Sequence, residues 1–439
     1  MSERQPIGLP TLLRRLNTAN VLREIRFHGP ISRANIVKAT GLSQVTVNQI
    51  AIGLRKSGHV IEERSDKCPS RRGRRMSFLR FNAANGYVLG IDIAPAAVVV
   101  LVSDLDGKVV AEERRPVATN EQLHPQPLLA LVHSTIKLAL ASAGISRSAL
   151  RAAGIGVPGR VDPSSGRISF VPALPGWDGL TVGNRLARIL DCPVVVENDM
   201  HLAILAEQGF GSATTRDNAV YLHLGVGIGL GILVLGELYR GAAGAAGEMA
   251  FIPVSGDDET PAGNFGRFEW AAGSTSFRRL GRLAAGSSSC GLIRELCGGD
   301  LDRINAQVVV EAARRGDPAA AAILQQVVQQ LARGICAVQC ILDPRIIILG
   351  GEVTHAGSFL VDRLNAEVSR ITRPPVGKIV ISSLGEHGVA LGAVQVALCL
   401  IEERLFSVVP GTVFHHPTNR SVSNPDAADE PVVRSGVIS

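Results

Sequence analysis

A chain of 439 residues is too long for one ordinary hydrophobic core, so it predicts two or three domains. Its 46% of hydrophobic residues and its 47 glycines are typical of a soluble α/β protein with many tight strand-to-helix turns. No apolar run reaches the ~18 residues that a membrane span needs, and no apolar signal segment opens the chain. We therefore exclude a membrane-spanning protein and expect a cytoplasmic one.

The net charge of +6 is distributed unevenly along the chain. Residues 1–82 hold 16 Lys and Arg against 5 Asp and Glu, whereas the remaining residues hold 29 against 34. A basic N-terminal segment on a mildly acidic body is typical of a protein that binds nucleic acid through one end. The seven cysteines are scattered and form no Cys-x-x-Cys pair, so we interpret them as reduced thiols.

The basic segment has the pattern of a helix-turn-helix. Apolar residues recur at helical spacing over residues 12–27, and Gly29-Pro30 ends that helix. A serine N-cap signal precedes each of two further short helices, expected at 33–40 and from 43 to about 56. Gly41 can supply the turn between them, and two short helices joined in this way make the motif.

The second helix of this motif is expected to enter the major groove with its N-terminal part. The residues there that face away from the apolar stripe suit base recognition. Gln and Asn can pair bidentately with adenine, and a Val or Thr methyl can pack on a thymine methyl. A plain three-helix packing module is the alternative. The predicted base-reading residues are Gln44, Val45, Thr46, Asn48 and Gln49.

Two strand-like runs after Gly58 surround a charged loop and predict a β-hairpin wing, which completes a winged helix-turn-helix in residues 1–82. A charge run alone is usually a solvated loop. Beside a helix-turn-helix, four guanidinium groups on a flexible tip suit phosphates or a narrow minor groove. The predicted DNA-contacting residues of the wing are Arg71, Arg72, Arg74 and Arg75.

The rest of the chain shows one strand pattern twice. From Tyr87 and again from Ala219 it reads as an apolar strand, a turn and a second strand, with helix-like segments following. This repetition predicts a duplicated, bilobal α/β body. The expected ranges are 83–198 for the first lobe, with 388–405 packing back on it, 199–387 for the second lobe, and 408–439 for a flexible tail.

The segment from Thr214 to Glu269 carries a specific resemblance. It holds five glycines in HLGVGIGLGILVLG, the Gly-Glu pair of AAGEMAF, and a GNFGRFE run. This pattern resembles the signature of the ROK family of repressors, open reading frames and sugar kinases, and SRANIVKATGLSQVTVNQI resembles the winged head of its repressor branch. The resemblance covers about residues 12–402. It implies an actin-like, hexokinase-like body of the duplicated ribonuclease H-like type, with the ligand in the interlobe cleft.

The resemblance also implies sugar-binding residues. VVVENDMHL resembles a strand-to-helix segment in which Asn198 would bond sugar hydroxyls, and Asp199 matches the position that acts as general base in the kinases. Glu248 and Glu269 match two further acceptors. Three carboxylates and an amide suit a polyol, because each accepts hydrogen bonds from adjacent hydroxyls. A helix-capping role is the alternative for Asp199.

Residues that the family uses to bind zinc are absent from this chain. The zinc-binding His is replaced by Phe251, and the three Cys positions of the CxCGxxGCxE loop read Thr260, Ala262 and Arg267. With all four ligands replaced, we expect no metal site.

The phosphate-binding turns are altered as well. Kinases of this fold read DxGxT in the first turn, whereas this chain reads DIAPA from Asp92 to Ala96, which adds a Cβ, removes an N–H and lacks the hydroxyl. Val226 stands where the family usually has Thr in the second turn, although the glycines of that turn remain. Ile348–Val353 resembles the adenosine-side turn, and glycines in both places also serve tight strand turns. We therefore expect no ATP cofactor and no catalytic residue.

These features predict a DNA-binding transcriptional regulator, a repressor of carbohydrate-related genes, that senses a sugar or sugar derivative and is not an enzyme. The alternatives are an active sugar kinase with a DNA-binding head, and a regulator whose body senses a protein partner. The expected partners are double-stranded operator DNA, a sugar-type effector and further copies of the chain. A two-fold symmetric operator calls for a homodimer or homotetramer.

Overall fold

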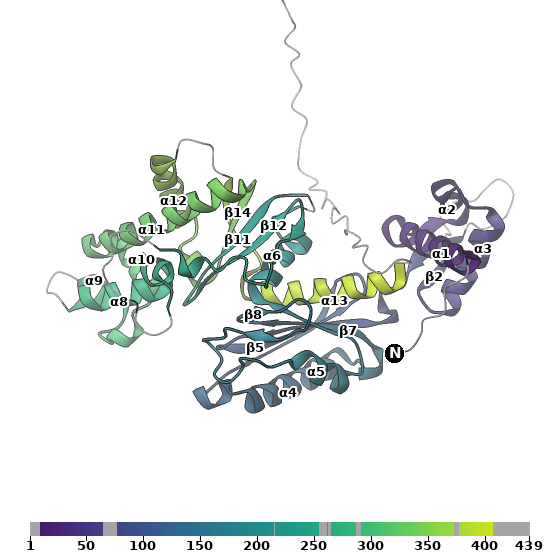
Figure 1. The fold of residues 1–439 in the computed structure, drawn as a ribbon, viewed down its shortest axis with the longest axis horizontal. Coiled ribbons are helices and arrows are strands. Elements are labelled where there is room, and N and C mark those ends of the chain that lie inside the picture. Colours follow the sequence, from purple (N-terminus) through teal and green to yellow (C-terminus); the bar gives the residue numbers. More distant parts are fainter. Residues whose placement is uncertain are drawn as a thin grey trace, which may run out of the picture.

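The computed structural model describes residues 9–64, 77–214, 216–253, 261, 265–286, 291–372 and 377–406. The tail predicted at 408–439 lies outside these ranges. Among the described helices, none combines the length and the apolar character that a membrane crossing requires. Figure 1 shows a small N-terminal head at one end of a body with two lobes.

The three helices predicted for the basic segment are present, and a small sheet closes the unit. Ser32 Oγ accepts a hydrogen bond from the Asn35 N–H and caps one helix, and Ser43 Oγ caps the next by accepting from Thr46. Gly41, at φ +69°, supplies the left-handed turn between them. The elements are α1 (Leu9–His28), β1 (Ile31–Ser32), α2 (Arg33–Thr40), α3 (Gln44–Lys56), β2 (Val60–Arg64) and β3 (Ser77–Phe81), with the strands in the order β1-β3-β2.

The first lobe is built on a mixed sheet whose described strands follow the order β10-β7-β4-β5-β6. Its bounds are β4 (Tyr87–Ile93), β5 (Ala97–Asp104), β6 (Val109–Pro116), β7 (Leu150–Val157) and β10 (Val194–Asn198). The first three strands are antiparallel neighbours, whereas β7 and β10 run parallel to β4. Helices α4 (Pro125–Ala143) and α5 (Val182–Leu190) cover one face (Figure 1), and β8 (Arg160–Val161) pairs with β9 (Ile168–Ser169).

The second lobe repeats this topology in the order β13-β12-β11-β14-β15, again with three antiparallel strands followed by two parallel ones. Its strands are β11 (Ala219–Leu224), β12 (Ile228–Val234), β13 (Glu237–Leu238), β14 (Ile346–Gly350) and β15 (Lys378–Ile381). The duplicated α/β architecture predicted from the sequence is therefore confirmed.

Helices surround the second sheet and connect it to the first. They are α6 (Asp199–Phe210), α7 (Arg267–Ala272), α8 (Ser274–Ala285), α9 (Gly291–Leu296), α10 (Ala306–Arg314), α11 (Pro318–Leu342), α12 (Ser358–Ile371) and α13 (Gly388–Phe406). Short 3-10 turns occur at η1 (Ala83–Asn85), η2 (Asn120–Leu123), η3 (Arg147–Ala149), η4 (Met249–Phe251), η5 (Leu301–Arg303), η6 (Glu352–Ala356) and η7 (Gly385–His387). Of these elements, α6, α13 and η4 matter most for the site described below.

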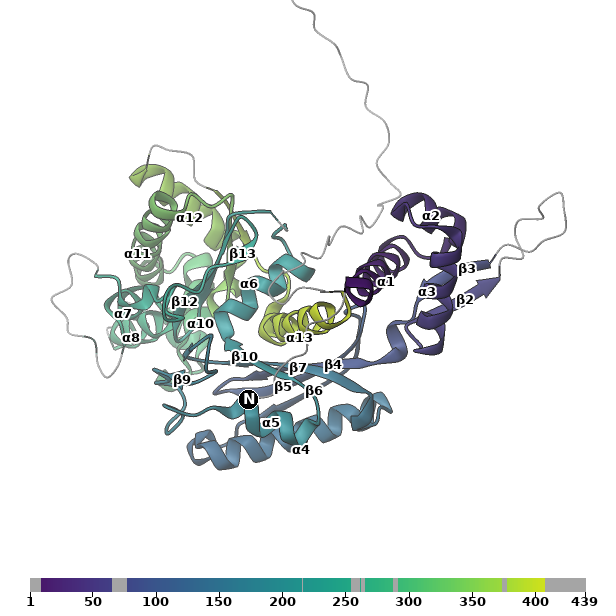
Figure 2. The same ribbon diagram turned by 45° about the vertical axis from the view of Figure 1, so that its right-hand side comes forward.

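Helix α13 is packed between two parts of the body. It contacts β4 and β7 on one side and α6 on another, and it runs along the first sheet in both ribbon views (Figures 1 and 2). Cβ atoms at Gly90 in β4 or Gly154 in β7 would overlap carbonyl oxygens of this helix. A Cβ at Gly392 would overlap the carbonyl oxygen of Leu202 in α6. The backbones therefore touch, and no space is left for even one methyl group.

The head shares a hydrophobic core with this part of the body. Leu22 of α1 and Leu398 of α13 belong to one cluster of buried residues. Beside it, Arg26 Nη1 donates to Glu402 Oε1 at 2.5 Å, and Arg26 Nη2 donates to the carbonyl oxygen of Leu105 at 3.1 Å. The Arg26 and Glu402 side chains are only 5% and 8% exposed, and Arg26 Nε also lies 3.6 Å from Asp106 Oδ1, so this guanidinium joins α1 both to α13 and to the turn after β5.

We expect Gly392→Ala to lower the free energy of unfolding by about 1–3 kcal/mol, because the added methyl group meets backbone rather than a movable side chain. Gly388→Ala is the matched control, since it lies in the same helix with nothing within 4 Å of an added Cβ. Urea unfolding followed by circular dichroism compares the two variants. Equal unfolding midpoints would contradict the close packing of α13 on α6.

Candidate functional site

The predicted base-reading residues lie together on one face of α3. Val47, Ile50, Ala51 and Leu54 are buried on the opposite face, against the rest of the head. Val45 is 66% exposed, and Gln44 Nε2 donates to Asn48 Oδ1 at a long 3.5 Å. Thr46 lies 2.8 Å, hydroxyl to hydroxyl, from the capping Ser43, and Gln49 is exposed. Of the predicted DNA contacts, Arg71, Arg72, Arg74 and Arg75 lie outside the described residues.

A carboxylate that the sequence analysis did not single out fastens the wing to the helices. Glu62 of β2 accepts a hydrogen bond from Arg33 Nη1 at 2.7 Å and forms an ion pair with Arg55 of α3. The hydrogen bond from Arg33 lowers the pKa of Glu62 to about 2, with Ser77 and the charge of Arg55 contributing. This carboxylate therefore stays ionised and fixes the angle between the wing and α3.

Asn198 is engaged in hydrogen bonds within the protein. It is the N-cap of α6, where its Oδ1 accepts from the N–H groups of Met200 and His201 at 2.9 and 3.1 Å. Its Nδ2 donates to the Gly159 carbonyl oxygen at 2.8 Å and to Asp199 Oδ1 at 2.9 Å. Both lone pairs of Asn198 Oδ1 and both N–H groups of its Nδ2 are thus used within the protein. The helix-capping role considered for Asp199 belongs to Asn198 instead.

Two carboxyl groups with raised pKa values, Asp199 and Asp92, lie near the N-terminus of α6. Burial raises the pKa of Asp199 to about 7, against the hydrogen bond that its own Oδ1 accepts from the Met200 N–H. Asp92, at the end of β4, is 8% exposed, and burial together with the charge of Asp199 raises its pKa to about 8. Both carboxyl groups therefore favour the neutral form more than an exposed aspartate does, because burial disfavours the charged form.

Glu197 links the two lobes beside this pair and was missed by the sequence analysis. Its Oε1 accepts from His201 Nδ1 at 2.9 Å, and its Oε2 accepts from Arg240 Nε, beyond β13, at 2.7 Å. Burial would raise the pKa of Glu197, but the hydrogen bond from His201 and the charge of Arg240 outweigh it and hold the pKa below its ordinary value. The resulting ion pair joins a strand end of the first lobe to a loop of the second.

A second contact between the lobes involves Glu248, one of the predicted ligand residues. Arg160 of β8 donates from Nε to Glu248 Oε1 at 2.9 Å, and its guanidinium carbon lies 4.9 Å from the centre of the Phe170 ring. Phe170 in turn meets Phe251 edge-on, with ring centroids 5.4 Å apart. Phe251, which stands at the family's His position, thus packs against the Phe170 ring of the opposite lobe. Neither Arg160 nor Phe170 was singled out from the sequence.

Both carboxylate oxygens of Glu269 accept hydrogen bonds from backbone N–H groups. Its Oε1 accepts from the Ile228 N–H at 3.0 Å, and its Oε2 accepts from the Gly266 N–H at 3.3 Å. Burial raises the pKa of Glu269, and the charge of Glu248 adds to the shift, which places these two carboxylates near each other. Of the four predicted ligand residues, Asp199 and Glu248 therefore keep the most oxygen capacity for a ligand.

The turns that correspond to phosphate contacts in the family offer few donors. The Ala94 N–H donates to the Ala97 carbonyl oxygen at 3.1 Å, and Pro95 has no N–H. In the second turn the Gly225 N–H donates to Gly227, and Val226 is 51% exposed without a hydroxyl. This donor set does not fit a nucleotide phosphate.

The positions that would hold zinc do not fit the metal either. Phe251 has no ligand atom, Arg267 is an exposed cation, and Thr260 and Ala262 lie outside the described residues. No cluster of three or more His, Cys, Asp or Glu suited to a metal occurs in the described part of the chain.

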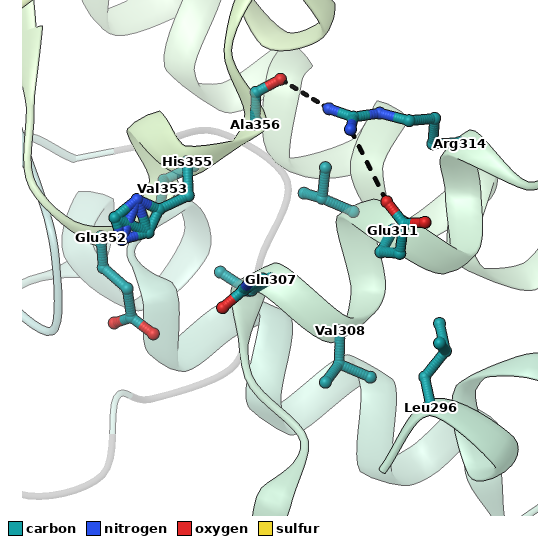
Figure 3. Close-up of a pocket in the computed structure, with 11 residues that line it drawn as sticks. Leu296, Gln307, Val308, Glu311, Arg314, Glu352, Val353, His355 and Ala356 are labelled. Atoms are coloured by element: carbon teal, nitrogen blue, oxygen red, sulfur yellow. Dashed lines mark hydrogen bonds and ion pairs between the residues drawn. The ribbon is translucent and has the colours of Figure 1, made fainter.

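A cavity of about 290 Å³ lies elsewhere, within the second lobe. Figure 3 shows Glu311 and Arg314 of α10 on one side and Glu352 and His355 of η6 on the other. Arg314 donates to the carbonyl oxygen of Ala356 at 2.9 Å and pairs with Glu311, which connects the two walls. The cavity borders the segment that resembles an adenosine-side turn, and none of the four predicted ligand residues lines it.

The chain is similar to sugar repressors and to sugar kinases. The family model described as the ROK family matches residues 88–399. A xylose repressor of Caldicellulosiruptor bescii is 28% identical over 89% of this chain and 98% of its own length. A glucokinase of Thermotoga maritima is 33% identical over 57% of this chain and 79% of its own length. The crystal structure of a ROK family transcriptional regulator, a homologue of the E. coli MLC protein, shares the fold at a TM-score of 0.71 and 24% identity, covering 90% of this chain and 98% of its own.

The raised pKa of Asp92 makes stability depend on pH. Between the ordinary carboxyl range and about pH 8, the folded protein holds a proton that the unfolded chain releases, so stability falls as pH rises through this window. The substitution Asp92→Asn introduces a side chain that cannot ionise, so this variant should not lose stability at position 92 as the pH rises. We expect its melting temperature to exceed that of the wild type above pH 8 and to match it near pH 5. An unchanged pH dependence in this variant would contradict the assignment, with the exposed Asp178→Asn as control.

Proposed function

Because the chain belongs to the ROK family, we propose that it is a DNA-binding transcriptional repressor of carbohydrate-related genes, controlled by a sugar or sugar derivative bound where the lobes meet. The exposed polar face of α3, on a head that shares its hydrophobic core with the body, carries this proposal. A helix of this kind reads base edges in the major groove. The xylose repressor supports the proposal because its match extends over most of the chain, whereas the glucokinase matches little more than half.

We propose further that the body is not a kinase and uses neither ATP nor zinc. Asp199 matches a kinase base, yet phosphoryl transfer depends on positioning and charge stabilisation of the phosphate. Ala94 and Val226 supply no side-chain donor for this, and Pro95 has no N–H. Asp199 then serves as an acceptor for ligand hydroxyls. ATP-dependent phosphorylation of a hexose by the purified protein would refute this part of the proposal and favour the kinase alternative.

The described contacts also suggest how the two ends communicate. Asp199 opens α6, α6 packs on α13, and α13 holds Glu402 against Arg26 of the head. We propose that the ranges 1–82, 83–198 with 388–405, and 199–387 are the structural units, with the packed helices α6 and α13 as the fixed joint between the two lobes. A ligand that binds two lobe arrangements with different affinity would shift the position of the head.

A repressor of this kind is expected to act in the cytoplasm as a symmetric homodimer or homotetramer, because two recognition helices related by a two-fold axis read a palindromic operator. Operator DNA and a sugar-type effector are the partners that this proposal requires.

The proposal predicts sequence-specific DNA binding that depends on α3. Selection of genomic fragments by the purified protein should yield a site, and Gln44→Ala or Asn48→Ala should weaken binding to it by about 1–3 kcal/mol while relaxing the preference at particular bases. Fluorescence anisotropy measures each affinity at fixed salt. Gln326→Ala, the same kind of change on an exposed position of α11, is the control. Selection of no site, or full affinity in both α3 variants, would contradict the proposed reading face.

A further inference from the structure

The guanidinium group of Arg160 is fixed on two sides and open on the third. Its Nε donates to Glu248 Oε1 at 2.9 Å, and its planar face lies over the Phe170 ring at 4.9 Å. Among the described residues, neither Nη group has a hydrogen-bond or ion-pair partner. The side chain is 35% exposed, so these Nη groups are within reach of a ligand.

The Nη groups of this guanidinium are suited to binding an anion. Arginine offers pairs of parallel N–H groups whose spacing matches the two oxygens of a carboxylate or phosphate. A free arginine side chain loses rotamer freedom when it binds, but Arg160 is already held by Glu248 and Phe170. We propose that Arg160 determines ligand specificity, and that the effector is a sugar derivative bearing a carboxylate or phosphate group bound by its Nη atoms. This inference rests on the proposed function, because it names the ligand of the same site.

Aromatic packing supports the position of the Arg160 guanidinium group. Phe170 adopts φ +51°, a left-handed conformation that is uncommon for a residue other than glycine and needs support from its surroundings. Its ring provides that support by meeting both Arg160 and the edge of Phe251. Phe251, at the position of a polar family residue, thus packs edge-on against the ring that lies next to the guanidinium.

The neighbouring polar groups fit a ligand that is both acidic and hydroxylated. Glu248 Oε2 and Asp199 Oδ2 have no recorded partner among the described residues and can accept from hydroxyl groups. Burial raises the pKa of both Asp92 and Asp199, which reduces the negative charge that an anion meets beside them. Asn198 and Glu269 hold the surrounding backbone in place.

The test is a calorimetric comparison of matched ligands on the full-length protein. The probes are glucose, glucuronate and glucose 6-phosphate; N-acetylglucosamine and its 6-phosphate; xylose and xylonate; and inorganic phosphate alone. We expect at least one acidic member to bind about tenfold or more tightly than its neutral parent. In the Arg160→Gln variant, the affinity for that acidic ligand should fall to the affinity for its neutral parent. The Arg160→Lys variant should retain part of the preference for the acidic ligand. Arg167→Gln, an exposed arginine on the same β8–β9 hairpin, should leave it intact.

The arms of this experiment separate the alternatives. Comparing carboxylate and phosphate derivatives of one sugar shows which anion the protein prefers. If inorganic phosphate bound as tightly as the sugar phosphate, the ligand would not be a sugar derivative. The inference also fails if neutral parents bind equally well, if no acid binds, or if Arg160→Gln keeps the preference. Operator binding is measured on the same preparations. Intact operator binding with no acid preference refutes this inference alone, whereas an acid preference without any operator refutes the proposed function.

Discussion

The packing of α13 between α6 and the first sheet is the constraint on which the rest of the structure depends. Its backbone touches β4, β7 and α6 at Gly90, Gly154 and Gly392, so it has no freedom to slide. Through the Arg26–Glu402 pair and a shared hydrophobic core it also holds the head. The head that carries α3 is therefore attached, through α1, to the element that packs directly on α6, the helix that Asp199 begins.

Away from the α6–α13 joint, the two ion pairs described between the lobes, Arg160–Glu248 and Arg240–Glu197, are polar and partly exposed. Arg160 and Glu248 are each about one-third exposed, and such ion pairs contribute only about 0–1 kcal/mol. Arg240–Glu197 is stronger, because Glu197 is buried and also bonded to His201. With a weak contact at Arg160 and a tight one at Arg26, we expect a modest ligand-binding energy to move one lobe without separating the head from the body.

Local sequence signals predicted the parts of the fold that depend on neighbouring residues. The serine caps at Ser32 and Ser43, with Gly41 between them, specify α2 and α3 within a few residues. Contacts over long sequence separations could not be predicted in this way. Arg26 meets Glu402 376 positions later, and Arg160 meets Glu248 88 positions later, so no local periodicity reveals either pair. The hydrogen-bonding commitments of Asn198 became visible only once Gly159 was placed beside it.

The proposed function requires the head and the lobe interface to be coupled through α13. Hydrogen-exchange mass spectrometry of the full-length protein, with and without the selected operator fragment, tests it most directly, since coupling between two sites is reciprocal. The account predicts that DNA binding changes amide protection in residues 194–210 and 388–402 as well as in the head. Changes confined to residues 9–81 would show that the head binds DNA independently and would contradict the coupling.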